Sequence, residues 1–310
     1  ARSLDPREGE AMMVASSIKT DLAREALAAA RRVRIRAGAS AEVPICIFDL
    51  VEEHYRDEIE LRFQAAPSLE GLYVRGEPSG GTTSIIIVSA MRPAGRQRNT
   101  CAHELGHHVF GHGSSIDEVV EDGTSRRFEP NEHVANAFAA FLTMPKLGIL
   151  KAFTDRDTRA ELASPTTVYA VASQFGVGFT TLVNHLWLTL GAMSADRAAR
   201  LLKVTPKRVR EELLGVAVPG ELVLFDQHWR GRAIDLALGD HVIVPPGAAV
   251  ETDTLKFVGK RSGGDAHVAV RVGRGRVVDG DSGNAAYVRV SRAQYEGRAL
   301  FRHLEEYDDE

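Results

Sequence analysis

The stretch His103-Glu104-Leu105-Gly106-His107 has the spacing of a metal site carried on a helix. Residues four apart lie one above the other on a helix surface, so both imidazoles can reach a single metal ion. Glu104 lies about 100° around the helix from His103, near enough to touch a water on the metal without binding the metal itself. The pattern predicts a catalytic zinc site in which two His bind Zn²⁺ and Glu104 accepts a proton from that water. The plainer alternative is an amphipathic helix with His and Glu on its surface.

A hydrolytic zinc site needs a third protein ligand. The extended metzincin pattern places a Gly three residues after the second His and a third His three residues later. Those positions hold Phe110 and Gly113 here, so that pattern fails. The alternative is an acidic residue on a second helix, predicted at residues 131–145, where an Ala-rich run before Pro145 would let two helices pack closely. Glu132 begins this helix, and a ligand role is favoured if its face is buried, because a buried carboxylate needs a partner.

Two longer motifs surround these residues. They read Arg98-Asn99-Thr100-Cys101-Ala102-His103-Glu104-Leu105-Gly106-His107 and Glu132-x-x-Ala135-Asn136-x-Phe138-Ala139-Ala140-x-Leu142-x-Met144-Pro145. Together they resemble the motifs of the ImmA/IrrE family of bacterial metallopeptidases, and the resemblance covers residues 15–215. It implies a zincin domain in which Glu132 is the third zinc ligand. It also implies a function, because members of this family cleave a partner helix-turn-helix repressor and so switch on stress-response, phage-defence or mobile-element genes.

Residues 158–215 are predicted to be helical. Within them, Thr167–Phe175 followed by Phe179–Leu190 has the spacing of a helix-turn-helix. The second helix of this pair holds no Lys or Arg, which a helix in a DNA groove needs, so we predict a packing helix. In the family the corresponding helices help to line the cleft, and His185 falls where relatives often carry His or Arg. The resemblance makes His185 a candidate for stabilising the oxyanion, with a buried structural role as an equal alternative.

From Gly220 the pattern changes to short alternating segments, which predicts a separate β-rich domain closed by a helix at Arg292–Leu304. The corresponding region of IrrE-like proteins resembles a GAF-type sensor fold. Basic residues with His267 and Tyr287 between them suit single-stranded DNA, which we consider as an activating ligand. These basic residues are Lys256, Lys260, Arg261, Arg271, Arg274, Arg276, Arg289 and Arg292. The alternative is an ordinary solvated sheet face.

The predicted fold class is α+β, in three parts. A zincin-like metallopeptidase domain (1–150) precedes a helical, helix-turn-helix-like segment (151–216) and a β-rich, GAF-like sensor domain (217–310). Paired strands are expected at Leu69–Val74 and Ser84–Ser89, and one of them would be the edge strand that pairs with an extended substrate. The polar stretch between Gly111 and Pro130 is expected to be a loop that borders the cleft, or a variable surface loop.

The composition bears on the protein's cellular location and on its binding partners. A net charge of −4 gives no global basic footprint for nucleic acid. The two Cys cannot form a disulfide framework, and no leader or long apolar run is evident, so we expect a cytoplasmic protein without a membrane partner. Cys46 and Cys101 are expected to be buried, although a thiolate in the open zinc position would be an inhibitory switch. Two rival functions remain: a DNA- or ligand-sensing transcription regulator with a structural or vestigial zinc site, and a zinc peptidase of broad specificity.

Overall fold

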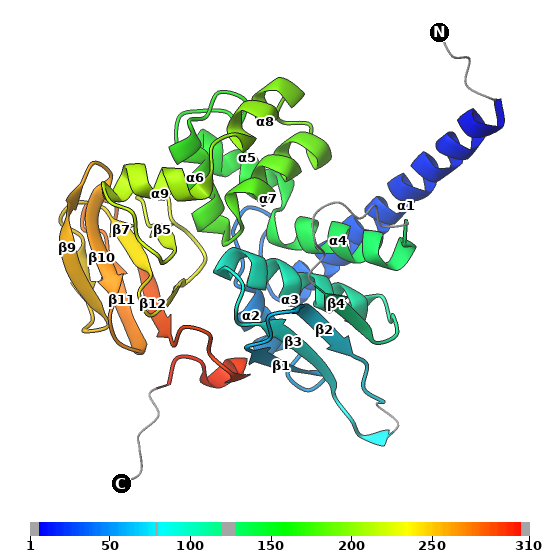
Figure 1. Cartoon of the computed structure of the whole chain (residues 1–310), viewed down its shortest axis with the longest axis horizontal. Coiled ribbons are helices and arrows are strands. Elements are labelled where there is room, and N and C mark those ends of the chain that lie inside the picture. The colour runs from blue at the N-terminus through cyan, green and yellow to red at the C-terminus, as the bar shows by residue number, and fades with distance from the viewer. Residues whose placement is uncertain (1–5, 78–79, 119–127, 305–310) are drawn as a thin grey trace.

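The computed structural model describes residues 6–77, 80–118 and 128–304. The predicted mixed α+β class is confirmed: helices and three sheets form one body, with the amino-terminal sheet at the lower right of Figure 1 and the carboxyl-terminal strands at the left. The first part consists of a five-stranded sheet and four helices. These helices are α1 (Pro6–Arg36), α2 (Ile47–His54), α3 (Ala94–Val109) and α4 (Pro130–Thr143).

The five-stranded sheet has the order β13-β1-β3-β2-β4. Its strands are β1 (Ile59–Gln64), β2 (Leu69–Val74), β3 (Ser84–Ser89), β4 (Ser115–Glu118) and β13 (Gly297–Arg298). β1 and β3 are parallel, while the other pairs, including the predicted β2–β3 pair, are antiparallel. Ile86 and Val88 of the β-branched run in β3 are completely buried, as expected for an interior strand.

The prediction that β2 or β3 forms the sheet edge is wrong, because both lie inside the sheet. The edge strands are β13 and β4, and β4 lies in the stretch predicted to be a loop. Four residues are too few for an alternating pattern to stand out, and long-range pairing with β2 determines the strand. Residues 119–127 of the same stretch lie outside the described part of the chain.

Helices α3 and α4 pack closely, as the Ala-rich run predicts. A Cβ added at Gly106 would lie 3.1 Å from the Cα of Ala135, so no larger residue fits there without movement. Leu105, Phe138 and Leu142 are completely buried in the core that these helices share with the sheet. This close approach brings the first turn of α4 over the middle of α3.

Five further helices cover the space between the two β-rich parts in Figure 1. They are α5 (Lys146–Thr154), α6 (Pro165–Phe175), α7 (Phe179–Asn184), which continues as a π-helix (His185–Thr189), α8 (Ala195–Leu202) and α9 (Pro206–Leu214). Phe179, Leu182 and Val183 are buried, so α7 is a packing helix as predicted. The stretch Pro130–Thr154 is apolar and long enough to be considered as a membrane span, but 56% of its apolar 18-residue window is buried inside the protein, as in a core helix.

The carboxyl-terminal part contains two four-stranded sheets. One has the order β5 (Leu222–Leu224), β7 (His241–Val244), β10 (Gly264–Ala269), β9 (Leu255–Arg261), and the other β6 (Ile234–Ala237), β12 (Ala285–Ser291), β11 (Gly273–Val278), β8 (Ala249–Glu251). A shared apolar core, with Val242 from one sheet and Val288 from the other, places the sheets face to face. The GAF-like fold and the domain boundaries stay predictions.

The predicted helix at Arg292–Leu304 is wrong. The segment forms β13 and a short 3₁₀ helix (Ala299–Phe301) instead. Gly297 has a φ of 130°, which a helix does not allow, and β13 pairs with β1 of the amino-terminal sheet. The segment therefore returns the chain to the sheet that supports α3.

The amino- and carboxyl-terminal parts meet around Asp235 of β6, whose side chain is 10% exposed. The Nε of Arg289 donates to its carboxylate at 2.7 Å, and four further side chains have nitrogens within 4.0 Å. We call this group the Asp235 cluster: Asp235, Arg98, Arg232, Arg289, Arg302 and His303. Burial alone would raise the pKa of Asp235, but the surrounding guanidinium groups lower it far below its usual value. Arg98 belongs to α3, so the cluster joins β6 to the helix of the His103 motif.

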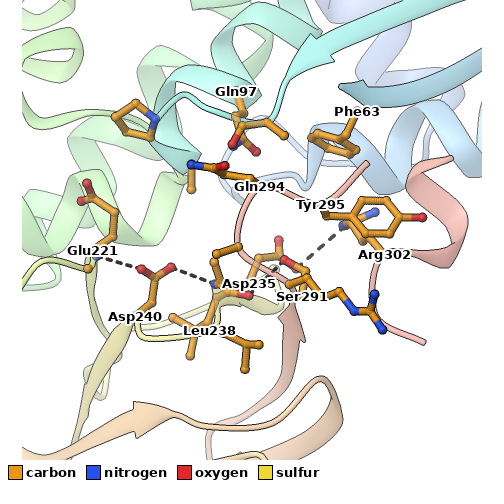
Figure 2. A pocket seen from close by; sticks show the side chains of 18 of the residues that line it. Phe63, Gln97, Glu221, Asp235, Leu238, Asp240, Ser291, Gln294, Tyr295 and Arg302 are labelled. Carbon is orange, nitrogen blue, oxygen red and sulfur yellow. Dashed lines mark hydrogen bonds and ion pairs between the residues drawn. The ribbon is translucent and has the colours of Figure 1, made fainter. Parts of the chain in front are cut away.

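A cavity of about 360 Å³ lies beside this cluster, between the two parts of the protein. Figure 2 shows Gln97 and Phe63 on one wall, and Asp235 and Asp240 on the other. Both carboxylate oxygens of Asp240 accept backbone N–H groups, from Glu221 and Ala237 at 2.8 Å. Asp240 therefore stabilises the turns at the cavity wall.

Candidate metal centre

Three predicted ligands converge where α3 and α4 cross. His103 and His107 lie one turn apart on α3, and their Nε2 atoms are 3.0 Å from each other. Glu132 in the first turn of α4 places Oε2 3.2 Å from His103 Nε2 and Oε1 3.3 Å from His107 Nε2. Both imidazoles are almost fully buried, whereas the Glu132 side chain is one-third exposed. The predicted packing of two helices therefore brings the residues together.

The separations of these atoms fit a single metal ion. Bonds of about 2.0 Å in a tetrahedral zinc site place neighbouring ligand atoms about 3.3 Å apart. The Nε2–Nε2 separation of 3.0 Å and the contacts of 3.2 and 3.3 Å that the two carboxylate oxygens of Glu132 make with these nitrogens, one oxygen to each, are close to that edge length. Two imidazole nitrogens with one carboxylate are also a donor set typical of a hydrolytic zinc site with one open position. His103, His107 and Glu132 can thus hold a metal ion.

Glu104 is completely buried beside this group. A Cβ at Gly71 of β2 would lie only 2.5 Å from Glu104 Oε1, so the strand accommodates the carboxylate by carrying Gly there. The Oγ of Ser115 donates to Oε2 at 3.3 Å. Burial is the main cause that raises the pKa of Glu104, to about 8. A carboxyl group with such a pKa is suited to exchanging a proton near neutral pH.

His112 supports His107, which the sequence did not reveal. The Nδ1 atoms of the two rings are 3.0 Å apart. If Nε2 of His107 binds a metal, its Nδ1 carries the proton and donates to Nδ1 of His112. Burial lowers the pKa of His112, which favours the neutral form that accepts this hydrogen bond.

Asp117 is a second residue that the sequence analysis missed. It lies on β4, and its Oδ2 is 3.2 Å from His103 Nε2. His103, Glu104 and Asp117 form a second group that could hold a metal ion, and this group shares only His103 with the first. The one available signal was the polar spacing of Ser115 and Asp117 around Ile116, which is too short to assign a strand.

His185 is not brought into contact with these residues in the described part of the chain. Its Nε2 lies 3.0 Å from the carbonyl oxygen of Met144, and its ring packs edge-on against Phe141. Burial lowers the pKa of His185 to about 4, so the ring is neutral. This environment fits the structural alternative, and the predicted catalytic role remains a prediction.

Both cysteines are buried, as expected. The Sγ of Cys46 lies 3.3 Å from Arg289 Nη2, at the Asp235 cluster. Burial raises the pKa of the Cys101 thiol well above its usual value. Among the residues that the structure describes, neither thiol belongs to a group that could hold a metal. The structure therefore gives no support to an inhibitory thiolate.

The comparison with known families agrees with this arrangement. Residues 56–186 match the family model Peptidase M78, an IrrE N-terminal-like domain. No curated protein matches the chain at a significant level. The matched segment begins before β1 and ends in the π-helix, so it includes α3, β4 and α4 with the possible metal ligands, Glu104 and Asp117. Residues 56–186 therefore form a metallopeptidase domain of the ImmA/IrrE family.

Proposed function

We propose that this protein is a cytoplasmic, zinc-dependent, site-specific endopeptidase that cleaves a helix-turn-helix repressor and so derepresses stress-response, phage-defence or mobile-element genes. The observation that carries the proposal is the buried carboxylate of Glu104 beside the three ligands. A purely structural zinc site has no use for such a group, because burying a carboxylate without a metal or cationic partner is unfavourable. The family match supports a protein substrate, and the choice of a repressor rests on the family resemblance.

The residues would divide the work as follows. His103, His107 and Glu132 would hold Zn²⁺, which supplies a water of lowered pKa and polarises the scissile carbonyl. Glu104 would accept the proton of the attacking water and deliver it to the leaving amine. The hydrogen bond from Ser115 orients the carboxylate of Glu104 for this transfer. His185 could stabilise the oxyanion only if its ring turned away from the Met144 carbonyl.

The edge of the sheet offers a place for the substrate backbone. Among the described residues, β4 pairs with β2 on one side only, and Ile116 in its middle is 66% exposed. An extended peptide can add to such an edge through main-chain hydrogen bonds. Ser115 and Asp117 of the same strand contact Glu104 and His103, so a peptide paired with β4 would lie beside the reacting groups.

A matched pair of proteins tests the proposal. The wild-type chain and Glu104→Gln would each be co-expressed with the small helix-turn-helix protein encoded by a neighbouring gene, under DNA damage, and products mapped by mass spectrometry. We expect one cut with the wild type and a rate about 10²- to 10⁴-fold lower with the variant, because proton transfer is lost. Both proteins should contain one zinc per chain. Cleavage by Glu104→Gln, or loss of its zinc, would mean that base and ligand are assigned wrongly.

We propose further that the carboxyl-terminal sheets act as a sensor for single-stranded DNA. Phe257 and Tyr287 are 52% and 71% exposed, and Lys256 and Lys260 flank Phe257 on β9. Part of the predicted basic surface is neutralised, since acids pair with three of its members: Arg271, Arg276 and Arg289.

Fluorescence anisotropy with a labelled oligonucleotide tests the sensor role. The full chain should bind single-stranded DNA with an affinity that falls as salt rises, because phosphate contacts release counterions. A Phe257→Ala variant should bind more weakly, since a base can stack on the ring. The DNA-sensing proposal fails if the oligonucleotide neither binds nor changes the cleavage rate.

A further inference from the structure

Asp117 contacts an atom that a metal would use. Its Oδ2 lies 3.2 Å from Nε2 of His103, the distance at which Glu132 Oε2 contacts the same nitrogen. The side chain of Asp117 is 23% exposed, so it is partly open to solvent. Two carboxylates from different elements, β4 and α4, thus flank one imidazole nitrogen.

This contact differs from the usual support of a metal-binding His. A supporting carboxylate normally accepts the proton on the ring nitrogen that faces away from the metal. For His103 that nitrogen would be Nδ1, which has no hydrogen-bond partner among the described residues. Asp117 lies instead against Nε2. Once Nε2 binds a metal it has no proton to donate, so Asp117 must then bind the metal, accept a hydrogen bond from a water on the metal, or turn away.

The strand carrying Asp117 directs two polar side chains toward the site. Side chains two apart on a strand point to the same face. Ser115 contacts Glu104 and Asp117 contacts His103, while Ile116 between them is exposed. β2 makes room for this arrangement, because Gly71, the strand partner of Asp117, presents no side chain to Glu104. The backbone pairing of β4 with β2 therefore holds Asp117 beside His103.

We propose that Asp117 is a fourth protein ligand of the resting metal site. In the structure Asp117 shares a possible ligand group with His103 but not with His107 and Glu132, so its carboxylate would have to rotate toward those two residues to take the position that the water and the scissile carbonyl need. Two neutral imidazoles, two carboxylates and Zn²⁺ have a net charge of zero, which suits a largely buried site. Four protein ligands make a closed site, and an open position is required for hydrolysis. Asp117 thus keeps the resting site closed until a peptide that pairs with β4 displaces it; this step rests on the proposed peptidase function.

Two measurements test this assignment, because loss of Asp117 should lower the affinity for zinc and raise the access of other ligands to the metal. We would compare the full-length wild type with Asp117→Ala and Asp117→Asn, using Ile116→Ala as a control on the same strand. Zinc affinity is measured by competition with a chelator, and access by the affinity for acetohydroxamate, a small zinc-binding probe. The absorption bands of Co²⁺-loaded protein report the number of ligands.

Loss of the ligand should weaken zinc binding about tenfold and strengthen acetohydroxamate binding by a similar factor. The Co²⁺ bands should change in both Asp117 variants and stay unchanged in Ile116→Ala. A merely structural role for Asp117 would weaken both affinities together. The inference is overturned if the Asp117 variants match the wild type in zinc affinity, probe affinity and Co²⁺ bands.

The same samples separate this inference from the proposed function. If the wild type binds one zinc and its cleavage depends on Glu104, but the Asp117 variants behave like the control, then only the role of Asp117 is wrong. If the wild type itself binds no zinc, the proposed function fails, and the role of Asp117 as a ligand fails with it.

Discussion

Two groups of ionisable residues share the helix α3, and the charge at the centre of one is opposite in sign to the charge that the other could hold. In the first, which we call the metal cluster, His103, His107 and Glu132 turn their ligand atoms toward one point suited to a cation. In the Asp235 cluster, a carboxylate of the protein itself is at the centre, and cationic side chains including Arg98 surround it. Arg98 and His103 belong to the same helix, so one element serves both.

The difference suggests that the metal cluster serves catalysis and the Asp235 cluster serves the stability of the fold. A site that needs an added ion can be loaded, emptied and regulated, whereas a site completed by its own side chains can only hold parts of the protein together. Breaking a buried ion pair by removing one partner typically costs about 3–5 kcal/mol. We therefore expect changes at the metal cluster to affect activity first, and changes at the Asp235 cluster to affect stability first.

Removal of the metal should produce the largest effect. A chelator should abolish cleavage and leave the protein folded, because its apolar cores are built without the metal ligands. Free zinc at 1,000 times its Kd would stabilise the fold by about 4 kcal/mol, so the melting temperature should fall when it is removed. Circular dichroism with and without chelator shows whether the fold is retained, and thermal unfolding measures the change in melting temperature. Unfolding of the metal-free chain at room temperature would favour the rival regulator with a structural zinc site.

The substitution Asp235→Asn should lower the stability of the protein and leave its zinc binding intact, the reverse of what metal removal does. It removes the central charge and leaves buried guanidinium groups unpaired, so the free energy of unfolding should fall by about 3–5 kcal/mol. Zinc content should stay at one per chain. Asp253→Asn is the matched control, because Asp253 pairs with Arg271 at the surface and is 71% exposed. Denaturant unfolding and zinc analysis would show whether the clusters are independent; zinc loss in Asp235→Asn would show that Arg98 couples them.

Lowering the pH should release zinc from the metal cluster before it weakens the Asp235 cluster, and one titration can show both events. The pKa of Asp235 is lowered from its usual 3.8, so its contribution to stability is complete above about pH 4 and disappears as the pH falls through its lower folded value. Zinc binding needs neutral imidazoles. Burial alone would lower the pKa of His103, but its contacts with Asp117 and Glu132 raise that pKa to about 10, so protons should displace zinc at a higher pH than the one at which Asp235 protonates. A zinc indicator and circular dichroism, followed together from pH 7 to pH 3, should show release before unfolding. Simultaneous transitions would contradict this separation.

Removing the support of His107 should give the smallest effect. His112→Ala should weaken zinc binding about 10- to 100-fold, because the ring of His107 loses the partner that fixes its orientation. His108→Ala is the control: His108 lies on the same helix but contacts Tyr73 and Glu58 instead. Chelator competition measures both variants. Equal losses in the two would mean that helix stability, rather than the contact with His112, sets the zinc affinity.

Local patterns predicted much of the fold and of the metal cluster. His103 and His107 are four residues apart, and helical geometry alone places their rings together. Strands β2 and β3 have the predicted bounds. The β-branched run in β3 marks one strand, and β2 lies on the other side of a Gly-containing loop. Glu132 could be assigned from its motif and from the small residues that let α4 approach Gly106.

The remaining features depend on contacts between distant segments. β4 is four residues long and exists because β2 offers it a partner, so the position of Asp117 could not be foreseen. The amphipathic pattern of Arg292–Leu304 suggested a helix, yet the open edge of β1 recruits Gly297–Arg298 as a strand. The Asp235 cluster combines residues from α3, β6, β12 and the segment after the 3₁₀ helix, and no local signal connects them.

The strand β13 has a consequence for the timing of folding during synthesis. All the metal ligands and Glu104 are made long before Gly297–Arg298, which completes the outer side of the five-stranded sheet. Arg289 and Arg302, which neutralise Asp235, also emerge late from the ribosome. Amino-terminal parts generally begin to fold first, but the pairing of β13 with β1 and the ion pairs of Asp235 cannot form before these late residues have been made. We therefore expect the peptidase half to remain loosely formed until these late residues are made, which would protect the newly made chain and its neighbours from premature cutting.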